Sequence, residues 1–583
     1  MITIILISVY IRQPTAPTEE QLSKRFSEFK IQYDKKKADG YDVTEAEEFA
    51  RKAKRAFDRK DYRTANKLLE SAFEALEKAT ISVAPVKPIK VETNCIDGID
   101  NDGDGLIDNE DGDCWIREGP IYETHPYYYD GTFKGLIKKI PEIADLGVKT
   151  IYMMPIWEHD RDPSLIYRVL DYHKIDPKYG TEEELKELVN TVHRYDMKII
   201  FDLTTSIGVK KSVIWSNGWN IRISLSELQE KAKHLGWDLE YKATPEGKFV
   251  YYHCQQKNSA MWCEVCGEII DDEVVLYHYP RASRGPAVDR TNPEVIKYFT
   301  KIAKFYVENY NIDGWRIDNP RDNWNPKVVS GDHSIVKLLR SIKKSITEVS
   351  PNSILCAENS QISTSKEPVL DEMCEASYSY PFQNYVAKIN WRTSTSKDLL
   401  TFLENEKVWY NRTKIRFLET HDTKRIKEIY PQLSKPLLVL ISTIPGIPMI
   451  QAGQEIGATN QFFSDSPQVD WANGDYKLRE FYKKVFEIRN NNNALKYGSI
   501  SNVWKSGDNT YAYLRSYEDE RVIVVINFLD KKATSTLDLS FLDKGTVLHD
   551  ELNNESFVVD DPNKFEISVP AYGSRILVLE DRK

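Results

Sequence analysis

The fold of this chain is constrained most by a regular alternation of short apolar strands and amphipathic helices between about residues 120 and 453. Strands are expected at 120–129, 149–155, 198–203, 313–318, 353–358, 414–422 and 447–453. Helices are expected at 132–147, 181–195, 292–310, 334–349, 396–409 and 435–443. This rhythm predicts an α/β fold with a closed parallel (β/α)8 TIM barrel, whose functional residues lie at the carboxyl ends of the strands.

Polar residues at those strand ends are the candidate site. In chain order they are Asp202, Arg316, Asp318, Glu358, His421 and Asp422. An Arg/Asp pair on one strand is more often a structural salt bridge, but here three carboxylates from different strands converge on one mouth. Retaining glycoside hydrolysis uses such a set: an ionised nucleophile, an acid with a raised pKa and a further acid that binds sugar hydroxyls. We expect the Arg316 guanidinium to keep Asp318 ionised.

Seven segments then resemble the successive blocks of one family. They are IYETHPYYYDGTFKGL, IPEIADLGVKTIYMMPIWE, DYHKIDPKYGTEEELKELV, GWRIDNP, the Glu of CAEN, FLETHDTKR and GIPMIQAGQEIG. In this order they resemble the α-amylase superfamily, glycoside hydrolase family 13, from about Ile121 to Arg489. The resemblance implies that Asp318 is the nucleophile, Glu358 the general acid/base and Asp422 the third catalytic carboxylate. It also implies a set of substrate-binding residues, namely Arg316, His421, Asp202 and Tyr167.

The chain departs from this family at positions that shape the site. Ser206 and Ile207 stand where the family's first block has an Asn-His pair, and Arg168 replaces an aspartate after Tyr167. Asn319 and Pro320, after the nucleophile, resemble the glucan maltosyltransferases of the same superfamily. We therefore expect a retaining hydrolase of α-glucans such as starch or maltodextrins with altered specificity. The alternatives are an α-glucan transglycosylase and a catalytically weak extracellular glucan-binding protein.

A long segment, about 205–291, is expected as a B domain inserted after the third strand, and it contains a cysteine cluster. Cys263 and Cys266 form a C-x2-C pair that resembles a zinc knuckle, and Cys254 with His253 could complete a Zn²⁺ site. This ligand set is incomplete as a motif. Disulfide pairing is therefore favoured over zinc.

A second candidate metal site lies in CIDGIDNDGDGLIDNEDGDC, expected as a unit over 94–115. Its spacing matches the Ca²⁺ loop of the EF-hand, with Gly105 at the turn and ligands from Asp100, Asp102, Asp104, Leu106, Asp108 and Asp111. The alternative is an acidic solvated loop. Cys95 and Cys114 bracket the loop and are expected to form a disulfide, and calcium with a disulfide indicates an extracellular or cell-surface protein.

The remaining segments are expected to be accessory. Residues 1–16 contain an apolar run that is either a signal remnant or a buried terminal strand, 17–80 is expected to form an α-helical hairpin, and 81–93 a linker. The hairpin could be a protein-docking module, a spacer or a helical appendage. The catalytic barrel is expected over 116–493 and a C-terminal antiparallel β-sandwich over 494–583. A net charge of −10 argues against a nucleic-acid partner, and no integral membrane segment is expected.

Overall fold

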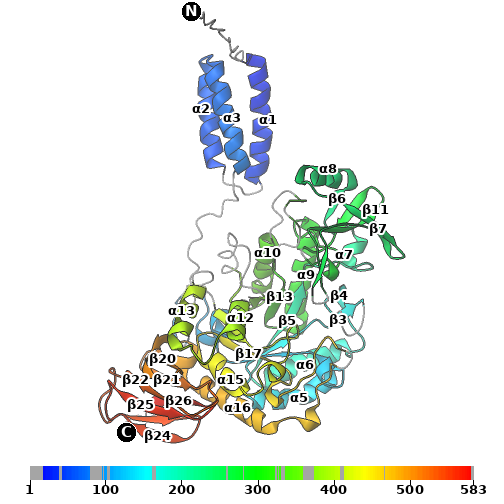
Figure 1. Cartoon of the computed structure of the whole chain (residues 1–583). Helices are drawn as coiled ribbons and strands as arrows, with labels where there is room; N and C mark the ends of the chain where they lie inside the picture. Colours follow the sequence, from blue (N-terminus) through cyan, green and yellow to red (C-terminus); the bar gives the residue numbers. More distant parts are fainter. Residues whose placement is uncertain are drawn as a thin grey trace, which may run out of the picture. The chain divides into compact units, whose positions relative to one another are not determined.

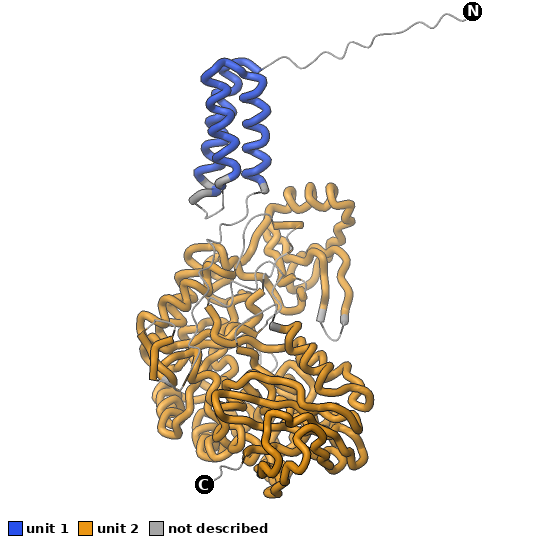
Figure 2. The backbone as a smooth tube through the Cα atoms, turned by 90° about the vertical axis from the view of Figure 1, so that its left-hand side faces the viewer, with its two compact units in different colours: residues 1–89 blue, residues 90–583 orange. Residues whose placement is uncertain are grey.

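The computed structural model describes the chain apart from residues 1–16, 39–42, 79–94, 96–97, 102–104, 161–165, 258–259, 280, 322–324, 326, 330–334, 359–372, 408–412, 465–466 and 580–583. The chain divides into two compact units, Met1–Ile89 and Lys90–Lys583, shown in blue and orange in Figure 2. The expected signal remnant or terminal strand and the expected linker lie outside the described residues. No helix in the described part is long and apolar enough to span a membrane.

The larger unit is built on a closed barrel of parallel strands, as predicted (Figure 1). Its strands, in the order around the barrel, are β1 (Ile121–Thr124), β17 (Ile447–Gln451), β16 (Thr413–Phe417), β15 (Ala376–Tyr378), β14 (Ile354–Ala357), β13 (Gly314–Asp318), β5 (Lys198–Thr204) and β2 (Thr150–Met153). Nearly every strand residue is buried, as expected for parallel strands covered by helices. Gly314 is required at the start of β13, because a Cβ there would lie 2.4 Å from the Ile354 carbonyl oxygen.

Amphipathic helices pack around the barrel strands and bury their apolar faces in one large core. They are α5 (Phe133–Asp145), α6 (Glu182–Arg194), α9 (Pro293–Tyr310), α10 (Val336–Thr347), α12 (Tyr380–Lys388), α13 (Ser396–Lys407), α15 (Ser434–Thr443) and α16 (Tyr476–Asn491). Their starts follow from local sequence. Thr181 and Glu184 form a capping box at α6, while Asn292 caps α9 with Pro293 in its first turn.

The insertion after β5 forms a small domain with its own apolar core. Its antiparallel sheet has the order β6 (Arg222–Ser224), β12 (Glu273–Leu276), β11 (Val265–Ile270), β8 (Gly247–Tyr252) and β7 (Glu240–Thr244). Helix α8 (Leu225–Leu235) follows β6, and a short 3-10 helix, η3 (Ala282–Arg284), precedes the return to the barrel. This arrangement agrees with the B domain expected at about 205–291.

The C-terminal region forms two antiparallel sheets, in agreement with the predicted sandwich. The larger sheet has the order β18 (Ser499–Asn502), β20 (Tyr511–Tyr517), β21 (Glu520–Ile526), β26 (Ser574–Leu579), β23 (Val547–Asp550) and β24 (Glu555–Val558). The smaller one contains β19 (Trp504–Gly507), β22 (Ala533–Leu537) and β25 (Phe565–Val569). Apolar residues of both sheets share one core.

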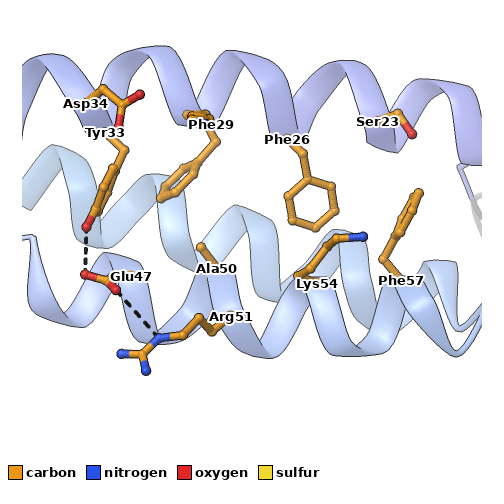
Figure 3. Close-up of a pocket in the computed structure, with 11 residues that line it drawn as sticks. Ser23, Phe26, Phe29, Tyr33, Asp34, Glu47, Ala50, Arg51, Lys54 and Phe57 are labelled. Carbon is orange, nitrogen blue, oxygen red and sulfur yellow. Dashed lines mark hydrogen bonds and ion pairs between the residues drawn. The ribbon is translucent and has the colours of Figure 1, made fainter.

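The smaller unit contains α1 (Glu19–Ala38), α2 (Thr44–Asp58) and α3 (Tyr62–Lys78). Helices α2 and α3 form the predicted hairpin. A third helix, α1, packs on α3, so this region contains one helix more than the predicted hairpin. Helices α1 and α2 leave between them a groove of about 500 Å³, lined by aromatic side chains that include Phe26, Phe29 and Phe57 (Figure 3). Across this groove the Tyr33 hydroxyl donates a hydrogen bond to Glu47 at 2.6 Å.

Candidate active site

Arg316 is the centre of the candidate site at the carboxyl ends of the barrel strands. It lies on β13, almost fully buried, and its Nη1 is 2.8 Å from Asp202 Oδ2 on β5 and 3.0 Å from Asp318 Oδ1. Its Nη2 is 3.3 Å from Glu358 Oε1, just after β14. One guanidinium therefore holds three carboxylates from three neighbouring strands.

Asp202 and Arg316 were expected to bind substrate, and this role stays a prediction; both side chains are almost fully buried. Asp202 has no exposed surface, and its Oδ2 also accepts hydrogen bonds from the hydroxyls of Tyr152 at 2.6 Å and Tyr167 at 2.7 Å. The Asp202 carboxylate is therefore held by Arg316 and two tyrosines, and it fixes the position of the Arg316 guanidinium.

Glu358 is held by the backbone of the segment that follows Asp318. The Asn319 amide donates a hydrogen bond to Glu358 Oε2 at 2.6 Å, and the Tyr380 hydroxyl lies 3.3 Å from Oε1. Asn319 has a φ of 41°, the left-handed conformation that asparagine tolerates better than most residues. The backbone of residue 319 has this conformation where its amide contacts Glu358. An asparagine after Asp318 is therefore explained, because asparagine tolerates the conformation.

Burial and neighbouring charges shift the pKa values of the two buried acids in opposite directions. Burial and the nearby Glu358 charge raise the pKa of Asp318 to about 7, although Arg316 and Arg284 oppose the shift. Burial would raise the pKa of Glu358 too, but Arg316, Arg284 and the Asn319 amide lower it below its ordinary value. Arg316 favours the ionised form of Asp318, but its charge is shared with Asp202 and Glu358, and burial with the Glu358 charge outweighs it.

His421 and Asp422 follow β16 on the opposite side of the barrel mouth. The His421 ring stacks on Tyr167 with centroids 5.3 Å apart, and its Nε2 lies 2.8 Å from the Tyr167 hydroxyl and 3.8 Å from Asp422 Oδ2. The Asp422 side chain is 43% exposed, so it remains available to a ligand. The predicted residues at the ends of β5, β13, β14 and β16 are thus brought together.

Glu123, at the end of β1, is a site residue that the sequence interpretation missed. Its buried Oε1 contacts Nδ1 of His421 and accepts a hydrogen bond from the His421 amide at 3.3 Å. Burial alone would lower the pKa of His421, but the charges of Glu123 and Asp422 outweigh it and raise that pKa to about 9. Glu123 lies one residue before the last residue of β1. The search for polar residues at the carboxyl ends of the barrel strands could therefore have found it.

The segment in place of the family's Asn-His pair is covered by the inserted domain. Ile207 forms an antiparallel bridge with Ala287, and the Val288 amide donates to the Ser206 carbonyl at 3.1 Å. Ile207 is buried and apolar, so it cannot replace the hydrogen bonds of a histidine. Arg168, the other departure, is paired with Asp160 at 3.0 Å.

Two of the three cysteines in the cluster of the inserted domain form a disulfide, which is the alternative that was favoured over zinc. Cys254 and Cys263 are bonded, and the buried Cys266 is a free thiol whose pKa is raised to about 12 by burial. The three sulfurs lie within 4.8 Å of one another. A zinc ion would need three thiolates here, so the residues as bonded do not fit the zinc interpretation.

The predicted calcium loop is described only in part, because Asp102 and Asp104 lie outside the described residues. The Cys95–Cys114 disulfide forms as expected. Asp100 accepts a hydrogen bond from the Gly105 amide at 2.9 Å, and Asp108 accepts one from the Gly98 amide at 3.0 Å. Carboxylates folded back over a glycine turn suit a hard cation, while among the described residues the acidic side chains form no three-ligand group.

Comparisons with known proteins agree with this geometry. The family model of the α-amylase catalytic domain matches residues 98–479, and the model of the maltogenic amylase C-terminal domain matches residues 502–576. The chain belongs to the α-amylase family. Strands β1 to β17 and the site residues therefore lie in an α-amylase catalytic domain, and the C-terminal sandwich lies in the region matched by the second model.

Individual relatives are distant. A cyclomaltodextrinase of Thermoanaerobacter pseudethanolicus is 26% identical over 445 residues, covering 74% of this chain and 69% of the relative. A maltogenic α-amylase of Bacillus acidopullulyticus is 23% identical over 487 residues, covering 80% and 73%. Among solved structures, an Anoxybacillus α-amylase superposes with a TM-score of 0.62 at 20% identity, covering 80% of this chain and 99% of that one, which shows a shared fold.

Proposed function

We propose that the chain is a retaining glycoside hydrolase that acts on α-glucans through a covalent glycosyl-enzyme intermediate on Asp318. The observation that supports this most is the bridging of Asp318 and Glu358 by one guanidinium, inside an α-amylase catalytic domain. Retaining enzymes need two carboxyl groups that lie close together, whereas inverting enzymes leave room for a water between them. The relatives named cyclomaltodextrinase and maltogenic α-amylase support an α-glucan substrate.

The mechanism assigns one task to each side chain. Glu358 donates its proton to the glycosidic oxygen while Asp318 attacks the anomeric carbon, and Glu358 then deprotonates the incoming hydroxyl that releases the sugar. Glu358 must hold the proton at the moment of attack, and Arg316, which contacts both acids, favours the ionised form of Asp318 that attack requires. The Asp202–Arg316 pair holds both acids in place, and Asp422 binds ring hydroxyls at the exposed side of the site.

His421 and Tyr167 complete the sugar-binding face. Because the pKa of His421 is raised to about 9, its imidazole is protonated at neutral pH and Nε2 donates a hydrogen bond. The Tyr167 ring stacks on His421 and offers an aromatic surface of the kind that packs against sugar rings. These residues replace part of what the absent Asn-His pair would supply.

Transfer to a second sugar is the alternative reaction of the same intermediate. Buried, apolar Ile207 supports it, because it stands where the family has a histidine and cannot hydrogen-bond a water that would hydrolyse the intermediate. Under hydrolysis, products are shorter than the donor. Under transfer, some products are longer.

The test is incubation of the full chain with starch and maltooligosaccharides, followed by chromatography of the products. Wild type should release shorter glucans, and Asp318→Asn and Glu358→Gln should each lower turnover by roughly a thousandfold or more. If wild type gives no product that depends on Asp318, the chain is a glucan-binding protein and not a glycosidase.

The accessory modules carry three further proposals. Calcium would bind the 94–115 loop through Asp100, Leu106, Asp108 and Asp111 together with Asp102 and Asp104. Two disulfides support an oxidising location outside the cytoplasm. A protein partner would dock in the aromatic groove between α1 and α2. Replacing Phe26 in this groove with a charged residue should then abolish capture of that partner.

A further inference from the structure

Asn319, the residue after the proposed nucleophile, is held by hydrogen bonds at its amide, its carbonyl and its side chain. The backbone amide donates to Glu358 Oε2 at 2.6 Å. The carbonyl accepts from Arg290 Nη1 at 3.5 Å, and the side-chain Nδ2 lies 2.8 Å from Nε2 of His278. The position of the Asn319 amide beside Glu358 therefore depends on contacts made by the rest of the same residue.

Two of these three contacts come from the inserted domain. His278 and Arg290 both lie in the part of the insertion that returns to the barrel, and both side chains are buried. His278 is fixed in turn, because its amide donates to the Gly285 carbonyl at 2.8 Å. The insertion thus supports Asn319 from outside the barrel.

His278 is suited to accept the hydrogen bond from Asn319. Burial and nearby arginine charges lower the pKa of His278 well below its ordinary value, so its imidazole is neutral. A neutral imidazole accepts at one nitrogen and carries its proton on the other. With Nε2 accepting from Asn319, the proton lies on Nδ1, which is shielded from solvent and has no hydrogen-bond partner among the described residues. A buried donor without a partner is unfavourable, so local stability does not explain a histidine here.

The support matters because the backbone of Asn319 has an uncommon conformation. Its φ is 41°, in the left-handed region that few residues other than glycine adopt. Such a conformation persists only where the surrounding structure fixes it. Without the contacts to its side chain and carbonyl, rotation of this residue would turn its amide away from Glu358. His278 can therefore act on Glu358 through Asn319.

The Asn319 amide favours the ionised form of Glu358. Burial would raise the pKa of Glu358, but the charges of Arg316 and Arg284 and this hydrogen bond lower it below its ordinary value. A general acid becomes ionised as it gives its proton to the departing sugar, so a donor that stabilises the carboxylate assists this step. The assistance is needed only for a leaving group that must be protonated.

We propose that His278 is a positioning residue of the inserted domain, which holds Asn319 so that its backbone amide supports Glu358 during proton donation to the departing sugar. The inference rests on the proposed function, because it needs Glu358 to be the general acid. It gives the insertion a part in the chemical step, in addition to covering the segment that follows β5.

The experiment compares two substrates that differ in their need for an acid. Maltohexaose releases a sugar hydroxyl, which must be protonated as it leaves, whereas α-maltosyl fluoride releases fluoride, which needs much less proton donation. His278→Leu should lower kcat/KM for maltohexaose about tenfold more than kcat/KM for α-maltosyl fluoride. His278→Gln keeps an acceptor for Asn319 and should restore most of the difference. A variant that is only loosened in structure would lose both activities in proportion.

Asn319→Gly is the independent variant. Glycine allows a φ of 41° and keeps the amide, but it removes the side chain that His278 holds. This variant should show the same selective loss as His278→Leu, and the double variant should lose no more than either single one, because one residue acts through the other.

His159→Leu is the matched control. His159 lies on β3 (Trp157–His159) and is also a buried histidine, with Nδ1 3.0 Å from the Trp157 carbonyl oxygen. Its replacement should leave the ratio of the two kcat/KM values unchanged. Thermal unfolding of every variant checks that it is folded, and if His278→Leu is not, the comparison is made with Asn319→Gly.

The outcomes separate this proposal from the proposed function. Proportional loss on both substrates, or additive losses in the double variant, overturns the positioning role of His278 and leaves the glycosidase intact. If wild type releases no product that depends on Asp318 from either substrate, the glycosidase itself is overturned, and the positioning role with it.

Discussion

Replacing Asp318 with asparagine should remove a pH dependence of stability that this one carboxyl imposes. Its pKa is about 7 in the folded protein, against an ordinary value of 3.8. Between these values the folded protein holds a proton on Asp318 that the unfolded chain does not, so wild-type stability falls as the pH rises from about 4 to 7. The asparagine variant has no such group. Its stability relative to wild type should therefore rise over the same interval and become constant above it.

The size of the effect follows from the pKa difference. A separation of about 3 pKa units corresponds to about 4 kcal/mol, at 1.36 kcal/mol per unit. For a unit of roughly 490 residues, an unfolding entropy of about 2.1 cal/mol/K per residue converts this into a shift in Tm of about 4 °C. The Tm difference between variant and wild type should grow by up to that amount between pH 4 and pH 8.

The assay is differential scanning fluorimetry of wild type and Asp318→Asn at pH 4, 5, 6, 7 and 8 and at constant ionic strength. A constant Tm difference for Asp318→Asn across this range would refute the reasoning, since Asp318 would then be no harder to ionise in the folded protein than in the unfolded chain.

Three other predictions concern the site and the calcium loop. Because the Asp318–Glu358 pair loses its last proton near the pKa of about 7 of Asp318, kcat/KM for maltohexaose should fall above this pH, and a profile that is flat to pH 9 would contradict the proton assignment. Glu123→Gln should return the His421 pKa towards its ordinary value and lower kcat/KM about tenfold or more at pH 8. NMR titration of the His421 ring measures this pKa in the variant. An unchanged His421 pKa would show that Glu123 is not the cause of the raised value. Calcium removal should increase hydrogen exchange at residues 95–114 without abolishing activity, whereas simultaneous loss of both would mean that the loop supports the site.

The barrel was predictable because its strands are apolar runs separated by amphipathic helices. The sixth strand, β15, was not identified: it has only three residues, Ala376–Tyr378, with a serine at its centre, and so lacks an apolar run. Glu123 was missed for a related reason. The first strand was expected to extend to residue 129 but ends at Thr124, so an acid at its end was taken as part of its interior.

Other features could not be found from sequence because they depend on tertiary contacts. The returning segment of the inserted domain has no periodicity, and only its pairing with residues 206–208 attaches it to the segment that follows β5. The proton distribution between Asp318 and Glu358 depends on how the single Arg316 charge is divided among three carboxylates. Motif spacing indicates which acids meet, but not which of them holds the proton.

The sharing of Arg316 also has an evolutionary consequence. Since the one guanidinium of Arg316 contacts Asp202, Asp318 and Glu358 together, a substitution at any of these four positions changes the charge balance at the other three. Effects of such substitutions will not add, and repair of one change requires a second at a specific position. The four residues should therefore be inherited as a block. Diversification among descendants of this chain should concentrate on the inserted domain, which contributes none of these four residues.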